Sequence, residues 1–191
     1  MRRLLFLAWM LSACSNSSVN SNEDAHKAYL GLDESIDKAI TLGFKGFNEA
    51  SSANIPTEST TGDLSGTMTV TGQVDQGVSA NKQMRLLEAL DTYADTDGGI
   101  VYSTSSDAGT DGAPAALGMS LQSIPNGTLT GTLDGTYGMT GALKGTVTLQ
   151  VTFSGQLEPN DAGGVERKPG TTQINVTATS GSGVYTDTFT R

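Results

Sequence analysis

The sequence contains one cysteine, one histidine and one tryptophan in 191 residues, and this scarcity excludes several kinds of chemistry. The cysteine, Cys14, has no second cysteine in the chain with which to form a disulfide. Because Cys14 and His26 both fall in the first 26 residues, the remainder of the chain cannot hold a Ser-His-Asp or Cys-His nucleophilic site. A zinc site built from histidine and cysteine is excluded for the same reason.

Positive charge and aromatic residues are also scarce. The chain has 11 Lys and Arg against 20 Asp and Glu, a net charge of −9, and 6% aromatic residues. Nucleic-acid binding depends on neutralising phosphates, so an acidic chain is a poor candidate for it. The same charge disfavours electrostatic binding to anionic lipid, and the few aromatic rings disfavour a stacking platform for sugars.

The first fourteen residues carry the most specific pattern in the sequence. A basic start, Met1-Arg2-Arg3, precedes the eight apolar residues Leu4–Leu11. A helix needs about 20 apolar residues to span a bilayer, so this run is too short to be a transmembrane segment. The arrangement predicts a cleavable export signal over residues 1–13.

The residues that follow the apolar run are Leu11-Ser12-Ala13-Cys14, and here the chain resembles a bacterial lipoprotein precursor. The resemblance implies cleavage before Cys14 and attachment of lipid to its sulfur, which would anchor the protein to a membrane. Ser15, in place of an inner-membrane retention aspartate, favours the outer membrane. Cleavage would leave 9 of the 11 Lys and Arg against 20 Asp and Glu, a net charge of −11.

Residues 14–32 are rich in serine and asparagine and contain little to bury, which predicts a flexible tether. His26 is expected to be a solvated residue of this tether. A single folded domain is expected to follow over residues 33–191, a length that can support its own core.

One helix is predicted over about 34–50. Asp33 can cap its start, and the acidic residues Glu34 and Asp37 lie in the first turn, where the helix dipole favours them. Apolar residues recur at helical spacing in this segment, at Ile36, Ala39, Ile40, Gly43, Phe44 and Phe47. Residues 51–63, which include Pro56, are expected to form a loop.

Strands are predicted from about residue 63 because apolar residues alternate with threonine there. The clearest stretch, residues 139–157, reads as one long strand or as two joined by a bend near Gly145. Residues 82–95 fit a helix or a strand; as a strand, Glu88 is the one charged residue among Met84, Leu86 and Leu90, and strand is preferred. The short turns predict a mainly β fold, a curved antiparallel sheet or partly closed β-barrel with the helix packed on it.

Two groups of carboxylates are candidates for chemistry. Asp95 and Asp97 resemble part of a calcium loop, but the full loop pattern fails, and a solvated turn is preferred; Asp107 and Asp111 could add ligands. A glycosidase-like acid pair would have to come from Asp75, Asp91, Asp134, Glu158 and Asp187, which no spacing selects. We therefore expect no enzyme, no cofactor and no bound metal.

Two functions remain open from the sequence. The first is a membrane-anchored structural or surface-interaction module, whose partner would be another envelope protein. The second is a binder or carrier of a lipid or other hydrophobic molecule inside the curved sheet. Glycines on the apolar face of the strands decide between these functions, because they either bend a packed sheet or clear space for a ligand.

Overall fold

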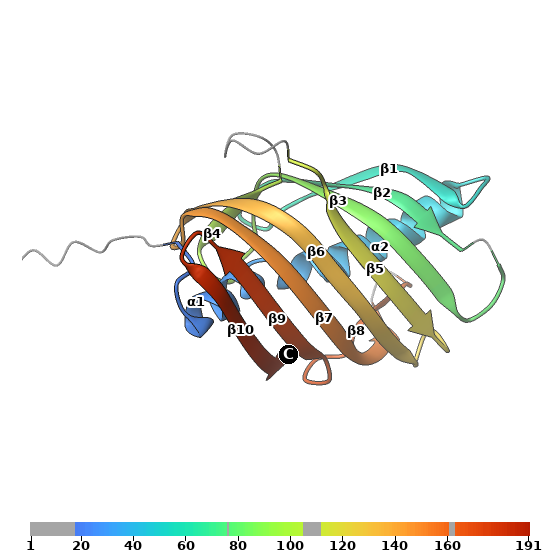
Figure 1. Ribbon diagram of the computed structural model, residues 1–191. Coiled ribbons are helices and arrows are strands. Elements are labelled where there is room, and N and C mark those ends of the chain that lie inside the picture. Colours follow the sequence, from blue (N-terminus) through green and yellow to red (C-terminus); the bar gives the residue numbers. More distant parts are fainter. Residues whose placement is uncertain (1–17, 76, 105–111, 161–162) are drawn as a thin grey trace, which may run out of the picture.

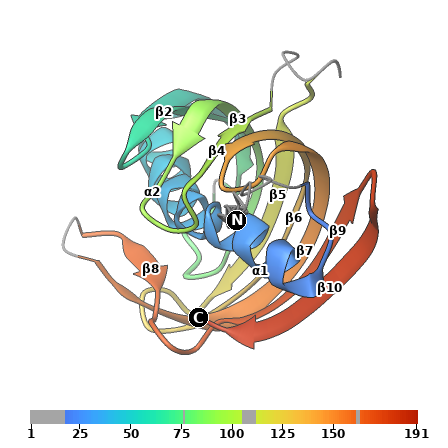
Figure 2. The same cartoon turned by 90° about the vertical axis from the view of Figure 1, so that its left-hand side faces the viewer.

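Residues 18–75, 77–104, 112–160 and 163–191 are described by the computed structural model. Ten antiparallel strands form one strongly curved sheet, with two helices on its concave side (Figures 1 and 2). The curved antiparallel sheet with a packed helix is therefore confirmed. The elements are α1 (Asn22–Leu30), α2 (Asp33–Glu49), β1 (Asn54–Thr61), β2 (Ser65–Val74), β3 (Lys82–Ala94), β4 (Ile100–Ser103), β5 (Ala115–Gln122), β6 (Thr128–Gly141), β7 (Gly145–Pro159), β8 (Val165–Arg167), β9 (Gln173–Ser180) and β10 (Gly183–Thr190).

Two short strands share one position in the sheet. The main path runs β1-β2-β3-β4-β6-β7-β9-β10, and β5 also lies between β3 and β6. β5 pairs with β3 over Lys82–Glu88, whereas β4 meets β3 at Tyr93. β4 therefore lies between β3 and β6 at one end of the sheet, and β5 lies between them at the other end.

The alternating stretch 139–157 is divided between two strands. β6 ends at Gly141 and β7 begins at Gly145, and the two pair from Met139↔Gly145 to Thr128↔Gln156. Gly141 and Gly145 have φ angles of 102° and 91°, which favour glycine. The prediction of one continuous strand is wrong, and the alternative of two strands joined near Gly145 is confirmed.

The helix predicted over 34–50 is confirmed as α2, and the curved sheet wraps around it (Figure 2). Glycine lowers the stability of an isolated helix by about 1 kcal/mol relative to alanine. Here the two glycines allow close approach to the sheet: a Cβ atom at Gly43 would lie 3.1 Å from Met84 Sδ, and one at Gly46 would lie 2.8 Å from Ile55 Cβ.

The predicted tether over 14–32 is wrong in its described part, because α1 forms there and packs on the sheet. Ser21 caps the helix by accepting a hydrogen bond from the Asp24 N–H at 3.1 Å. His26 is not a free tether residue: its Nδ1 lies 2.6 Å from Asp187 Oδ2 on β10, and its ring lies 4.2 Å from that of Phe189. The composition hid this helix because only three of its residues, Ala25, Ala28 and Tyr29, are buried.

Two further segments test the sequence predictions. Residues 82–94 form strand β3, as preferred over a helix. The loop expected over 51–63 instead contains β1, in which Pro56 is tolerated because this edge strand has a bulge between Ile55 and Glu58. The lipobox and Cys14 lie outside the described residues. No helix in the described ranges is both long and apolar enough to cross a membrane.

Candidate functional site

The glycines on the inner face of the sheet are covered by neighbouring side chains. A Cβ atom at Gly131 would lie 2.4 Å from the Phe153 ring, and one at Gly155 would lie 2.6 Å from Thr172 Oγ1. Together with α2, these side chains fill the space that the glycines leave. The inner face is thus a packed core where these glycines occur, and the candidate sites lie elsewhere.

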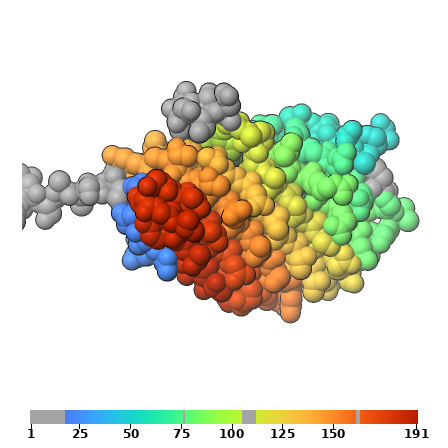
Figure 3. All heavy atoms as spheres, viewed as in Figure 1, coloured from blue at the N-terminus to red at the C-terminus, as the bar shows by residue number. Residues whose placement is uncertain are grey.

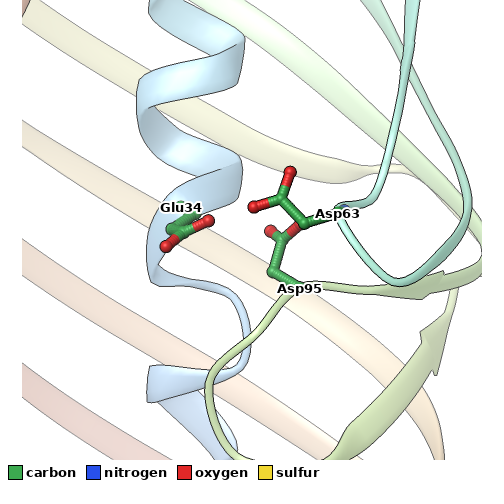
Figure 4. A group of neighbouring side chains, drawn as sticks. All are labelled: Glu34, Asp63 and Asp95. Atoms are coloured by element: carbon green, nitrogen blue, oxygen red, sulfur yellow. The ribbon is translucent and has the colours of Figure 1, made fainter.

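Three carboxylates meet where α2 passes the ends of β1 and β3. Glu34 comes from α2, Asp63 from the turn between β1 and β2, and Asp95 from the residue after β3 (Figure 4). One oxygen of each lies within 4.8 Å of the others, a grouping that could hold a metal ion. Asp95 is 1% exposed, and Glu34 is partly buried.

The ammonium group of Lys38 already provides positive charge to this cluster. Lys38 Nζ donates to Asp63 Oδ1 at 2.8 Å and to Asp95 Oδ1 at 2.5 Å. It also lies 5.4 Å from the centre of the Tyr93 ring, a cation–π distance. Tyr93 and the backbone N–H of Asp63 donate to Asp95 as well. The cluster is therefore a closed structural ion-pair network rather than an open metal site.

The pKa shifts in the cluster follow from this arrangement. Burial lowers the pKa of Lys38, but its bonds to Asp63 and Asp95 outweigh burial, and the pKa is raised. The bond from Lys38 lowers the pKa of Asp63. Burial and the neighbouring Asp63 raise the pKa of Glu34. Glu34 is thus more readily protonated than Asp63.

The two calcium candidates that the structure describes, Asp95 and Asp97, bind different cationic side chains. Asp95 faces Lys38, whereas Asp97 pairs with Arg191. Asp107 and Asp111 lie outside the described residues. The carboxylates considered for an acid pair lie on or beside five different strands, and no two of them are partners in the sheet register: Asp75, Asp91, Asp134, Glu158 and Asp187.

The outer face of the sheet carries rows of side chains that can form hydrogen bonds. One row, here called the central row, crosses seven strands: Gln73, Arg85, Gly118, Thr132, Thr152, Asn175 and Thr188. Asn175 Nδ2 donates to Thr152 Oγ1 at 3.3 Å, and Thr188 Oγ1 donates to Asn175 Oδ1 at 3.0 Å. The next row is Gln83, Ser120, Thr130, Ser154, Gln173 and Thr190, and none of its members is charged.

A hollow of about 560 Å³ lies on this face, here called the outer hollow, and the face is turned toward the viewer in Figure 3. Gly118 leaves a gap in the central row, since a Cβ atom there would meet only Thr132 Oγ1, at 3.4 Å. Arg85 lies beside the gap and donates to Gln73 Oε1 at 3.3 Å. Arg85 has no carboxylate partner in the described part of the chain, so its charge is available to an external group.

No protein-family model, curated protein or solved structure matches this chain. The assignment of a function therefore rests on the geometry of the fold and on the residues at its surface.

A second cavity, here called the end pocket, opens beside the C-terminal half of α2 and measures about 600 Å³. This volume is within the range of small-molecule sites, which are about 300–1,000 Å³. Its wall combines apolar side chains with amides, a hydroxyl and one cation: Phe44, Ile124, Pro125, Val165, Asn48, Asn160, Thr41 and Lys45. Lys45 is paired with Glu58 at 2.5 Å.

Sequence reasoning did not identify Lys38, Arg85 or either cavity. Lys38 lies one turn after Glu34, so these two residues of the ion-pair network are visible in the sequence as an i, i+4 pair. The other two residues of the network are Asp63 and Asp95, and their proximity depends on the sheet register. Arg85 was visible as the one cation at the outward positions of residues 82–94, but no sequence feature aligns it with Gly118.

Proposed function

We propose that this protein is a lipid-anchored protein of the bacterial cell envelope, on the outer membrane, whose folded domain is a non-enzymatic module for surface interactions. The sequence Leu11-Ser12-Ala13-Cys14 supports the anchor. The observation that carries the interaction function is the outer hollow, where Arg85, which has no carboxylate partner among the described residues, lies beside a gap in rows of hydroxyl and amide groups.

The outer hollow suits a polar protein partner. Hydroxyl and amide side chains both donate and accept hydrogen bonds, and arginine binds a carboxylate in a bidentate geometry. Arg85 and Thr132 border the gap at Gly118, so a partner side chain of moderate size can enter it. We therefore propose a partner in the envelope that presents a carboxylate to Arg85.

The anchor is tested by replacing Cys14. Cys14→Ser should move the protein from the membrane fraction to the soluble fraction of the envelope, and radiolabelled palmitate should label the wild type alone. Retention of Cys14→Ser in the membrane, or equal labelling of both proteins, would refute the anchor and leave the interaction function untouched.

The interaction face is tested by photo-crosslinking in cells. A photoreactive phenylalanine at Thr152, beside the outer hollow, should form a discrete adduct, whereas one at Leu64, which is 63% exposed on a distant turn, should not. Gly118→Gln should fill the gap and Arg85→Gln should remove its charge, so each should reduce the adduct at position 152. Equal adducts at positions 152 and 64, or adducts unchanged by both substitutions, would contradict the proposal.

A second candidate function is binding of a hydrophobic molecule, and the end pocket favours it. Phe44, Ile124 and Val165 supply an apolar wall, while α2 and the core fill the interior of the sheet. A ligand would then lie at the end of the sheet rather than inside it. Native mass spectrometry of the purified protein should show a bound molecule that Ile124→Trp excludes; a ligand-free mass in both proteins would remove this function.

A further inference from the structure

Glu88 is a carboxyl group buried in the core without a partner. It lies on β3 and is 0% exposed, and neither of its carboxyl oxygens has a hydrogen-bond partner in the described structure. The hydroxyl of Tyr137, on β6, is also buried without a partner. Native proteins satisfy nearly all of their buried polar groups, so a carboxyl group buried without a partner indicates a specific role.

The groups around Glu88 provide no positive charge. Ser35, on α2, is near Glu88, but its hydroxyl donates to the Leu32 carbonyl at 2.8 Å. The titratable groups that act on Glu88 or on Tyr137 from the neighbouring strands are three phenols and one carboxyl: Tyr93 on β3, Tyr102 on β4, Tyr137 on β6 and Asp134 on β6. Burial raises the pKa of all three phenols, so they remain neutral near neutral pH.

An unpaired charge in such a place is costly, so the carboxyl group retains its proton instead. Burial raises the pKa of Glu88 from 4.5 to about 8, against a smaller opposing effect of Ser35. The proton makes Glu88 a neutral acid at pH 7. Contact of the carboxylate with water would lower this pKa and favour ionisation.

The sheet offers one route to water at this point. Glu88 is paired with Ala115, the first residue of β5. β4 does not reach Glu88: it ends at Ser103, and the N–H of the next residue, Thr104, donates to the Leu90 carbonyl at 3.0 Å. A hollow of about 350 Å³ lies on the outer side, lined by Gly112, Ala113, Pro114 and residues 134–136 of β6. The ends of strands open at a low free-energy cost compared with their centres.

We propose that Glu88 is a proton-binding site that controls the closure of the sheet between β4 and β5. With the proton bound, β5 pairs with β3 from Glu88 onward and the wall is closed. When the proton is lost, the first residues of β5 separate from β3, and the carboxylate reaches water through the 350 Å³ hollow beside Pro114.

The pH dependence of this opening follows from the two protonation equilibria. In the open form, Glu88 has the pKa of a hydrated glutamate, 4.5, and in the closed form its pKa is about 8. Between these values the open form binds fewer protons, so the ratio of closed to open forms falls about tenfold for each pH unit. Below pH 4.5 and above pH 8 the ratio is constant.

Hydrogen exchange tests the location of the opening. After correction for the intrinsic pH dependence of exchange, protection of residues 112–118 in the wild type should fall about tenfold per unit from pH 6 to pH 8. Protection of residues 146–152 in β7, where β6 and β9 pair on both sides, should stay constant. In Glu88→Gln, protection of residues 112–118 should not depend on pH. A flat wild-type profile, or the same slope in both proteins, would overturn the proposal.

Infrared spectroscopy tests the proton without a substitution. At pH 7 the wild type should show the carbonyl band of a protonated carboxylic acid, and this band should disappear as the pH rises from 7 to 9. Tyr137→Phe should retain the band, because the phenol is not the proton donor. Absence of the band at pH 7 would overturn the proposal even where Glu88→Gln does not fold.

Discussion

The ring of Phe153 on β7 occupies the space that a side chain at Gly131 on β6 would need. The two residues are direct partners in the sheet register, and a Cβ atom at Gly131 would lie 2.4 Å from Phe153 Cζ. One strand therefore supplies the space and its neighbour supplies the ring. This pairing explains why a face with many glycines is a packed core where Phe153 lies.

Gly131→Ala should destabilise the fold, because the new methyl group collides with the Phe153 ring. Overpacking of a well-packed core costs about 1–3 kcal/mol, measured as the change in the free energy of urea unfolding. Gly118→Ala is the matched control: it lies on β5, at an outward position with room for a Cβ atom, and should change stability by less than about 0.5 kcal/mol. Equal effects of the two substitutions would refute the packing argument.

Lys38→Met should destabilise the protein, because it leaves Asp95 buried beside Asp63 without a cation. An uncompensated buried charge costs about 2–3 kcal/mol, and we expect a loss of this size at pH 7. Lys27→Met removes an exposed helical pair with Glu23, which solvent screens, and should leave the free energy of unfolding unchanged. If both variants unfold at the same urea concentration as the wild type, the Lys38 cluster is not a structural network.

Arg167→Lys should weaken the contact between β8 and α2 and so lower the free energy of unfolding. Arg167 donates to both oxygens of Asp37, at 2.9 and 2.7 Å, and to Asp33 Oδ1 at 2.8 Å, which a lysine cannot reproduce. We expect a loss of about 3 kcal/mol at pH 7, because Arg167 and Asp33 are both buried. Arg85→Lys, on the outer face, is the control and should leave the unfolding free energy unchanged.

The effect of Arg167→Lys should also depend on pH. Burial would raise the pKa of Asp33, but Arg167, Tyr29 and Arg191 outweigh it, and the pKa is lowered from 3.8. A lowered carboxyl pKa contributes stability that is complete above the unfolded-state value and is lost as pH falls through the folded-state value. The difference between wild type and variant should therefore shrink below pH 3.8; a constant difference down to pH 2 would contradict this assignment.

His26→Ala should detach α1 while leaving the sheet folded. The imidazole contacts both Asp187 and Phe189 on β10, and Tyr29 adds an edge-on contact with Phe189 at 5.6 Å. Limited proteolysis should cut the variant within residues 18–30 at a rate well above that of the wild type, and the thermal unfolding midpoint should fall, because Ala25, Ala28 and Tyr29 lose their contacts with the core. Glu23→Ala, whose side chain is largely exposed, should leave the cleavage rate unchanged.

The sequence carried enough information for the strands, because alternation along β2, β6 and β7 reports directly on one buried face. It also predicted α2, whose apolar spacing is regular. It failed at α1, where Ser21 and Asn22 read as tether composition although Ser21 caps a helix. Local pattern cannot show that Phe189, over 160 residues later, provides the surface on which α1 packs.

The candidate sites were predictable only in part. Glu88 was visible as the one charged residue among the inward positions 84, 86, 88 and 90, a local conflict that often marks a functional position. Lys38, Asp63 and Asp95 are each unremarkable in the sequence, since their meeting depends on two different turns and on the placement of α2. The gap at Gly118 depends on the register of β5 with β3 and β6, which places Gly118 between Arg85 and Thr132.

If Cys14 carries the proposed lipid, the position of α1 limits how far the domain can stand from the membrane. Only three residues, 15–17, lie between Cys14 and Ser18, the first described residue, and the four steps from Cys14 to Ser18 span at most about 14 Å. A lipid on Cys14 would therefore hold α1 and β10 near the bilayer surface. The end pocket, beside residues 41–48 of α2, lies about two to four turns of helix beyond Asp33, the first residue of α2, which is about 12–22 Å. The anchored protein would thus present the end pocket toward the surroundings and keep the α1 end at the lipid.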